Sequence, residues 1–219
     1  MPYKSLQESI SYSFKNIELL DLAFIHKSFD NNINNERLEF LGDSILNSVI
    51  SQYLFLKFPN EKEGLLTRMR AHLVRAESLT RKAEELLLED YIKLSKGTAN
   101  LSRDRKNSIL EDSFEALIGS IFLDSGWDQV NMITLKLFNK ELLSLSAETQ
   151  FKDSKTELQE LLQSIKLELP KYIIEDTGKG FNCSIEFKGN IFIASGPSKR
   201  VAETSSASKV LLYIKEHNE

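Results

Sequence analysis

Carboxylate side chains occur inside two segments of the chain that otherwise have the apolar spacing of buried helices. In the first segment, Glu36, Glu39 and Asp43 fall within a sector of roughly 60° on a helical wheel and border the apolar face. In the second segment, Asp112 and Glu115 share one strip of a helix that is apolar on most sides. Carboxylates in such places carry a large desolvation penalty unless they are paired. They are therefore the first candidates for chemistry.

Several kinds of partner would offset that penalty. A proton, a basic side chain or a divalent cation would each serve, and Gly119 on the same strip leaves room beside the second pair. Acids spaced four residues apart are also typical of a solvated helix face or of salt-bridge partners, so the residues alone leave both interpretations open. An all-oxygen ligand set favours a hard cation such as Mg²⁺ over zinc. We expect the scattered histidines, His26, His72 and His217, to be structural or exposed.

The elements that position these acids change character along the chain. Up to about residue 145 the apolar spacing is helical, and it predicts helices near residues 16–27, 36–57, 61–88, 104–124 and 127–145. Asn60 followed by Glu63 predicts an N-cap and a capping box for the helix that begins near residue 61. Residues 144–153 are polar and lack a period, which is typical of a linker.

The remainder of the chain has the pattern of a small α+β domain. Residues 154–165 repeat apolar positions at helical spacing, whereas residues 181–188 alternate strictly between apolar and polar, which predicts a half-buried strand. A turn at residues 188–190 leads into a second apolar run, and a helix closes the chain. We therefore expect an all-α domain over residues 1–148, a linker over residues 149–152 and a small α+β (αβββα) domain over residues 153–219.

Composition narrows the class of protein. Of the 219 residues, 41% are hydrophobic and 27% are charged, which is the balance of a globular protein. The single cysteine, Cys183, excludes an intrachain disulfide and suits a reducing compartment. With no signal peptide and no apolar run of roughly 20 residues, we expect a cytoplasmic protein without a membrane segment. The net charge of −4 means that any contact with nucleic acid must come from the placement of basic side chains.

Two motifs and the C-terminal module resemble the ribonuclease III family. Residues 35–46, NERLEFLGDSIL, resemble the signature motif of that family, and residues 108–119, SILEDSFEALIG, resemble its other catalytic segment. The module that opens with DSKTELQELLQ at residues 153–163 and closes with SKRVAE at residues 198–203 is similar to a double-stranded-RNA-binding domain. The resemblance covers essentially the whole chain, with both domains in the order of bacterial ribonuclease III.

The resemblance implies an activity and the residues that carry it. It implies an all-α nuclease domain that uses Mg²⁺, for which Mn²⁺ can substitute, to cleave double-stranded RNA to 5′-phosphate and 3′-hydroxyl ends with short 3′ overhangs. The implied substrates are ribosomal RNA precursors and structured messenger RNAs, with no small-molecule cofactor. The metal ions activate water and neutralise charge on the phosphate. The implied metal ligands are Glu39, Asp43, Asp112 and Glu115, with Asp43 and Glu115 as the central catalytic pair and with Glu36 and Glu63 in the active-site valley.

The resemblance also implies partners. The nuclease domain is expected to form a homodimer with one active site per subunit and with Phe40 at the interface, although the spacing fits a core phenylalanine equally well. The implied RNA contacts of the second domain are made by Thr156, Gln159, Glu160, Lys179, Lys199 and Arg200. Residues 178–181 lack the Gly-Pro and the histidine that the family commonly has in this loop. Either Lys179 replaces the lost contact or the loop binds more weakly.

Two other classes of function compete with the nuclease. A non-catalytic RNA-binding protein would use the nuclease fold as a dimerisation scaffold, but such relatives usually lack one or more of the four acids, which this chain keeps. A helical interaction module that never meets RNA would leave the carboxylates, and the Ser-Lys-Arg start of the last helix at residues 198–200, without explanation. The sequence therefore favours the endoribonuclease.

Overall fold

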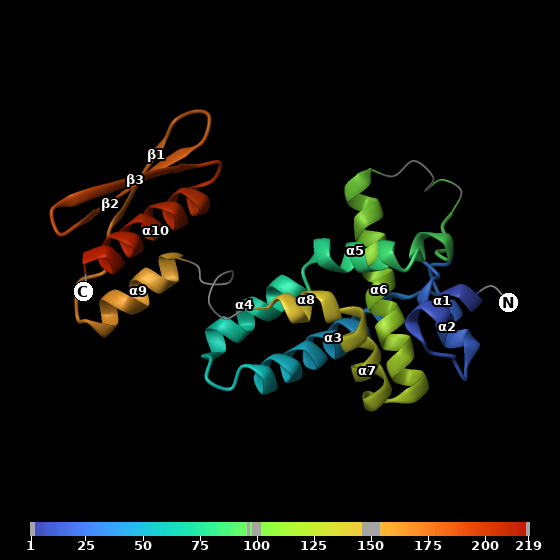
Figure 1. Cartoon of the computed structure of the whole chain (residues 1–219). Helices are drawn as coiled ribbons and strands as arrows, with labels where there is room; N and C mark the ends of the chain where they lie inside the picture. Colours follow the sequence, from blue (N-terminus) through green and yellow to red (C-terminus); the bar gives the residue numbers. More distant parts are fainter. Residues whose placement is uncertain (1–2, 96, 98–101, 146–153, 218–219) are drawn as a thin grey trace. The chain divides into compact units, whose positions relative to one another are not determined.

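The computed structural model describes residues 3–95, 97, 102–145 and 154–217 (Figure 1). The chain forms two compact units, residues 1–147 and 148–219, and each has its own core. The linker predicted over residues 149–152 lies outside the described residues. Among the described helices, none combines the length and the apolar character that crossing a bilayer requires.

The first unit is built from helices. In chain order they are α1 (Lys4–Ile10), α2 (Ile17–Ala23), α3 (Glu36–Lys57), α4 (Glu63–Leu73), α5 (Ala76–Glu85), the 3-10 turn η1 (Leu88–Asp90), α6 (Arg103–Ser125), α7 (Trp127–Leu137) and α8 (Asn139–Ser144). The all-α character expected of this unit is confirmed. The helices predicted over residues 36–57 and 104–124 are α3 and α6, whose apolar positions are buried along most of their length.

Two long helices predicted from the apolar spacing are each interrupted. The helix predicted over residues 61–88 is divided because Arg75 is extended, with φ −68° and ψ 151°, between α4 and α5. The helix predicted over residues 127–145 is divided at Phe138, a buried residue with φ −93° and ψ 8° between α7 and α8. Apolar residues are buried on both sides of each break. The apolar spacing of the sequence indicates which residues are buried, and it therefore does not reveal where the backbone changes direction.

The predicted start of α4 is also wrong. Asn60 is not the N-cap, since the helix begins at Glu63 with Lys62 in the cap position and without a side-chain cap. The Glu63 carboxylate instead accepts a hydrogen bond of 2.7 Å from Oγ1 of Thr67, one turn further on. Near the N-terminus, the helix predicted over residues 16–27 ends early at Ala23, and α1 is a helix that the spacing does not predict.

Helices α3 and α6 cross within the first unit (Figure 1). Two glycines let their backbones approach closely at the crossing. A Cβ atom on Gly42 of α3 would lie 1.7 Å from the backbone oxygen of Glu115. A Cβ atom on Gly119 of α6 would lie 2.3 Å from the backbone oxygen of Leu38. The space expected beside Gly119 is therefore filled by the backbone of α3. This close crossing sets the position of the acids that α3 and α6 carry.

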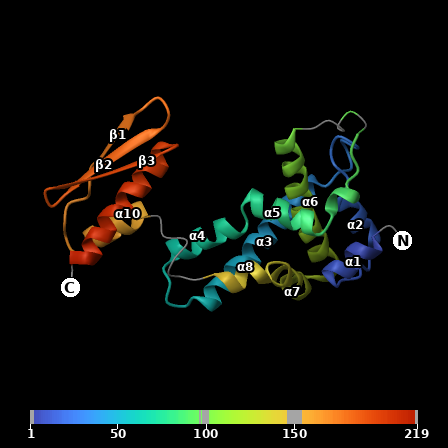
Figure 2. The ribbon, with the colours of Figure 1, turned by 45° about the horizontal axis from the view of Figure 1, so that its top comes forward.

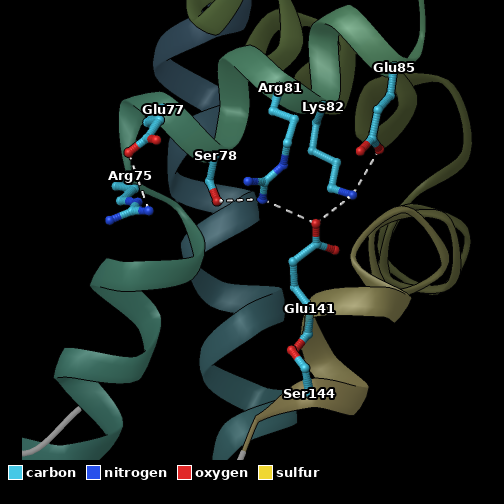
Figure 3. Close-up of polar contacts among 8 residues, drawn as sticks. All are labelled: Arg75, Glu77, Ser78, Arg81, Lys82, Glu85, Glu141 and Ser144. Carbon is cyan, nitrogen blue, oxygen red and sulfur yellow. Dashed lines mark hydrogen bonds and ion pairs between the residues drawn. The ribbon is translucent and has the colours of Figure 1, made fainter. Parts of the chain in front are cut away.

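Helix α5 is fastened to α8 by a buried ion pair (Figure 3). The side chain of Lys82 on α5 is only 3% exposed, and its Nζ lies 2.9 Å from Oε1 of Glu141 on α8. Arg81 reaches the same oxygen at 3.2 Å, and Glu85 lies 3.0 Å from Lys82. Nζ of Lys82 also stands 5.7 Å from the centroid of the Phe138 ring. The pair fixes how the two helices pack, because either charge would be costly to leave buried and unpaired.

The second unit has the predicted order of one helix, three strands and one helix. Its elements are α9 (Ser154–Ser164), β1 (Tyr172–Asp176), β2 (Phe181–Phe187), β3 (Asn190–Gly196) and α10 (Lys199–His217). The strands form an antiparallel sheet in the order β1-β2-β3, and both helices cover the same face of it (Figure 2). The alternation predicted for residues 181–188 places Cys183, Ile185 and Phe187 in the core, where Ile185 and Phe187 join Leu158 of α9.

Candidate functional site

Carboxylates from two helices come together where α3 crosses α6. They are Glu39 and Asp43 of α3 and Glu111, Asp112 and Glu115 of α6, which we call the carboxylate cluster. Burial, and then the negative charges of the other four members, raises the pKa of Glu115 from its usual 4.5 to about 8. Each of these charges is therefore close enough to act on the Glu115 carboxyl. The crossing therefore gathers the four predicted acids and one further acid into one site.

Three other members of the carboxylate cluster are half-buried and are shifted in the same direction. Burial raises the pKa of Glu39, and the charge of Asp112 raises it further. Burial raises the pKa of Asp112 as well, against the opposing charge of Lys27. The pKa of Glu111 is raised by burial and then by two of its acidic neighbours. Neighbouring acids whose pKa values are raised in this way are typical of a functional site, because their mutual repulsion does not stabilise the fold.

The carboxylate cluster has the donor chemistry of a site for a hard divalent cation. Its donors are carboxylate oxygens, which suit Mg²⁺ or Mn²⁺ better than zinc. Asp43 lies at the exposed edge, where Nδ2 of Asn47 donates a hydrogen bond of 2.7 Å to its Oδ1. Within the described residues, no three Asp, Glu, His or Cys side chains converge closely enough to hold an ion as they stand. The fit to a hard cation therefore rests on the oxygen donors and on the raised pKa of Glu115, whose charged form a cation would stabilise.

Of the two acids predicted for the active-site valley, the structure brings one to the carboxylate cluster. Glu36 begins α3 and forms an ion pair with Lys27, whose Nζ lies 2.9 Å from its Oε1. The charge of Glu36 adds to the effect of burial in raising the pKa of Glu39. Glu63 begins α4 and lies instead at a largely apolar cavity of about 670 Å³ between α3 and α4.

Sequence reasoning missed two residues of this site. Glu111 stands four residues before Glu115 on α6, the same spacing as Glu39 and Asp43, so the helical pattern contained a signal for it. Lys27 lies in the segment between α2 and α3. Spacing carries no signal for its contact, because the conformation of a loop decides which helix residue it meets.

Phe40 projects from α3 with 77% of its surface exposed, so its interpretation as a core residue is wrong. Together with Leu22, Ile33 and Leu123 it lines a cavity of about 750 Å³. Ile33 is 61% exposed and Leu123 is 53% exposed. A group of exposed apolar side chains of this kind is typical of a protein–protein interface.

The predicted RNA contacts of the second unit lie on α9, in the β1–β2 loop and at the start of α10. Helix α9 carries Thr156, Gln159 and Glu160, of which the last is exposed and the others are half-buried. Lys199 and Arg200 are exposed in the first turn of α10, where their charges add to the positive end of the helix dipole. Nζ of Lys199 lies 5.6 Å from the centroid of the Phe181 ring.

The loop between β1 and β2 is a short closed turn. The backbone oxygen of Gly180 accepts hydrogen bonds of 3.0 Å from both the N–H and Oγ1 of Thr177. Oδ1 of Asp176 accepts a hydrogen bond of 2.8 Å from the N–H of Gly178, whose φ of 73° favours glycine. Lys179 lies exposed between the two glycines. Its contact with RNA stays a prediction.

Comparison with known proteins agrees with both units. Residues 16–142 match the family model described as Ribonuclease-III-like, and residues 154–214 match the double-stranded RNA binding motif. The protein named Ribonuclease 3 of Aliarcobacter butzleri is 40% identical over 98% of both chains. That of Marinomonas sp. is 42% identical over 98% of this chain and 97% of its own. The solved nuclease domain of ribonuclease III from Campylobacter jejuni is 43% identical with a TM-score of 0.61, covering 63% of this chain and 96% of its own.

A helical unit with a carboxylate cluster, followed by an α+β unit with the double-stranded RNA binding motif, defines an endoribonuclease that binds double-stranded RNA. The chain belongs to the ribonuclease III family. Membership of this family implies a divalent metal cofactor.

Proposed function

We propose that this endoribonuclease cleaves double-stranded RNA in a reaction that depends on Mg²⁺, for which Mn²⁺ can substitute. The products carry 5′-phosphate and 3′-hydroxyl ends with short 3′ overhangs. The observation that carries the proposal is the carboxylate cluster, where burial and neighbouring acids raise the pKa of Glu115 to about 8. Glu39, Asp43, Asp112 and Glu115 would hold the divalent cation, which would supply a Lewis acid for the activation of water and would neutralise charge on the phosphate.

The chain's own residues hold and orient this site. The proposed metal ligands are Glu39, Asp43, Asp112 and Glu115, with Asp43 and Glu115 as the central pair. Asn47 orients the Asp43 carboxylate through its hydrogen bond. The contact between Gly42 and the Glu115 backbone fixes the distance between the two helices. Glu36 and Glu63 are proposed as outlying members of the active-site valley.

The active form of the protein is a homodimer with one active site per subunit, so that each subunit cuts one strand. Support comes from the exposed side chain of Phe40 and the apolar residues around it. The similar nuclease domain of Campylobacter jejuni ribonuclease III has a region involved in dimer formation.

A charged side chain in place of Phe40 tests whether this residue lies in the dimer interface. The variant Phe40→Asp would place two like charges in the proposed interface, and we expect it to sediment as a monomer and to lose paired cleavage of the two strands. Leu143→Asp, at another exposed apolar residue of the same unit, is the control and should remain dimeric. Sedimentation of Phe40→Asp as an unchanged dimer would remove Phe40 from the interface.

The second unit binds the RNA substrate and presents it to the nuclease. The proposed contacts are Thr156, Gln159 and Glu160 toward a minor groove, with Lys179, Lys199 and Arg200 toward phosphates. Support comes from the exposure of the two basic residues at the start of the long helix α10. The proposed cellular substrates are ribosomal RNA precursors and structured messenger RNAs. A cytoplasmic location is also proposed, supported by the free thiol of Cys183.

The deciding experiment incubates the full chain with a long, perfectly paired RNA duplex and Mg²⁺, Mn²⁺ or EDTA. We expect short duplexes with 5′-phosphates and 3′ overhangs with either metal and intact RNA with EDTA. The variant Glu115→Gln should bind the duplex and cleave it at least about 10²-fold more slowly, because a bound metal ion would lower the activation free energy by several kcal/mol. Wild-type cleavage by this variant would refute the metal assignment. Intact RNA that shifts on a gel with every metal would indicate a binding protein instead.

A further inference from the structure

Lys27 is a basic side chain at the edge of the carboxylate cluster, and the proposed reaction gives it no role. Its Nζ lies 2.9 Å from Oε1 of Glu36. Its charge also opposes the effect of burial on Glu39 and Asp112, whose pKa values would otherwise be raised further. The ammonium group is therefore within electrostatic reach of two proposed metal ligands.

The segment that carries Lys27 is fixed by hydrogen bonds to elements on either side. The N–H of Asn35, a residue only 2% exposed, donates to the backbone oxygen of Ile25 at 2.8 Å. The N–H of His26 donates to the backbone oxygen of Lys93 at 3.2 Å. Lys27 follows directly in the chain, so its side chain extends toward Glu36 from a backbone that is held in place.

The ion pair between Lys27 and Glu36 is suited to exchange. The two side chains are 57% and 49% exposed, and a surface pair of this kind adds little to stability. An ammonium group has three donors, of which the Glu36 carboxylate occupies one. A second anion can therefore bind Lys27, or replace Glu36 on it, at small energetic cost.

The anion that must reach this place is a phosphate of the substrate. RNA carries its charge on the backbone, and cleavage brings a phosphodiester to a group of carboxylates that repels it. A cation held by the acids would offset the negative charge at the centre of the site. The phosphates next to the scissile phosphate would instead lie at the edge of the site, near Lys27. Lysine binds phosphate there as a point charge, without the directional demand of arginine.

We propose that Lys27 is a phosphate-binding residue of the nuclease site, whose ammonium group leaves Glu36 and donates to a non-bridging oxygen of a substrate phosphate when RNA enters. This inference rests on the proposed function, because it takes the carboxylate cluster as the place of cleavage. Lys27 keeps its proton throughout and forms no covalent bond. Its contribution is to bind the RNA and to place the phosphodiester against the acids.

The test compares Lys27→Gln and Lys27→Arg in the full chain. The matched control is Lys4→Gln, which removes another exposed lysine of the same unit, one paired with Glu8 at 3.8 Å. Cleavage of a perfect RNA duplex with Mg²⁺ is measured over a range of salt concentrations to obtain kcat and KM. We expect Lys27→Gln to lower kcat/KM roughly 10- to 100-fold and to reduce the salt slope by about 1, because one phosphate contact is lost. Lys27→Arg should keep most of the activity, and Lys4→Gln all of it.

The variant Glu36→Gln separates phosphate binding from a role through Glu36 alone. If Lys27 binds phosphate, Lys27→Gln reduces the salt slope in the Glu36→Gln background as it does in the wild type. If Lys27 only holds Glu36 in place, the two single variants and the double variant lose the same activity and keep the wild-type salt slope, which would overturn the inference. Wild-type kcat/KM in Lys27→Gln would overturn it too. Glu115→Gln is assayed alongside, since wild-type cleavage by that variant would instead refute the proposed function.

Discussion

Two half-buried glutamates of the nuclease unit have opposite surroundings. Glu141 on α8 meets Lys82 and Arg81 at salt-bridge distance (Figure 3). Burial acts to raise the pKa of Glu141, but the hydrogen bond and charge of Lys82 outweigh it, and the pKa is lowered. Glu115 on α6 meets acids, and burial together with their charges raises its pKa to about 8.

The two glutamates differ in whether the protein itself compensates their charge. Lys82 and Arg81 compensate the charge of Glu141, so the contact of α5 with α8 needs no ligand to neutralise it. The charges around Glu115 repel one another, which costs stability in the absence of a cation. Such a cost is typical of a functional site, so the comparison supports the proposal that a metal ion binds where α3 crosses α6.

Removal of the buried cation should have the largest effect on stability. The variant Lys82→Ala removes the buried ammonium group from Glu141 and leaves Arg81 as its basic partner, so the loss should be at most about 3–5 kcal/mol of the free energy of unfolding, the cost of breaking a fully buried pair. Denaturant unfolding measures this loss, and kcat at low temperature should stay near the wild-type value. Lys4→Ala, which breaks an exposed pair, should change stability by less than about 1 kcal/mol. Equal losses of stability in Lys82→Ala and Lys4→Ala would show that the buried ion pair stabilises the fold no more than the exposed one does.

A methyl group at the helix crossing should have the next largest effect. In Gly42→Ala the new Cβ would lie 1.7 Å from the backbone oxygen of Glu115, so α3 and α6 must move apart. We expect a loss of about 1–3 kcal/mol of stability and a larger proportional loss of cleavage, because the acids of the two helices separate. Gly64→Ala is the control, since its Cβ would meet only Arg68 at 3.7 Å. A fully active Gly42→Ala would show that the close crossing does not position the site.

How much of this the sequence predicts depends on the range of the contacts involved. The long helices α3 and α6 follow from their apolar spacing because each buries a continuous face. The breaks at Arg75 and Phe138 do not follow, because they are changes of backbone conformation between stretches that are buried alike. In the second unit, strict alternation predicts β2 because one face of the sheet is covered by helices.

For the site, the motif identifies the acids, but the fold decides what lies next to them. The contact of Gly42 with the backbone of Glu115 joins residues far apart in the chain, and no spacing rule predicts it. The same holds for Lys27, whose position depends on how the segment before α3 is held. Glu111 is different, since its spacing from Glu115 was visible in the sequence. Acids at both ends of a helical turn therefore predict Glu111 as well as Glu115.

The two glutamates should also give opposite dependences of stability on pH. In metal-free protein the pKa of Glu115 is about 8 when folded and near 4.5 when unfolded, so the folded state binds more protons between these values. The contribution of Glu115 to stability therefore falls as the pH rises through this interval. The folded pKa of Glu141 is lowered, so its contribution is present above the unfolded pKa and is lost as the pH falls through the folded value.

This contrast predicts changes confined to particular intervals of pH. In EDTA, Glu115→Gln should reduce the slope of the stability curve between about pH 5 and pH 8, because one residue whose protonation changes there is gone. Glu141→Gln should leave that interval unchanged and flatten the curve below about pH 4.5, where the carboxylate paired with Lys82 otherwise takes up its proton. The free energy of unfolding is measured by denaturant titration at each pH. A neutral interval that keeps its slope in Glu115→Gln would mean that the acids around it do not act on that residue. The loss of stability caused by repulsion at the helix crossing would then have to come from another member of the carboxylate cluster.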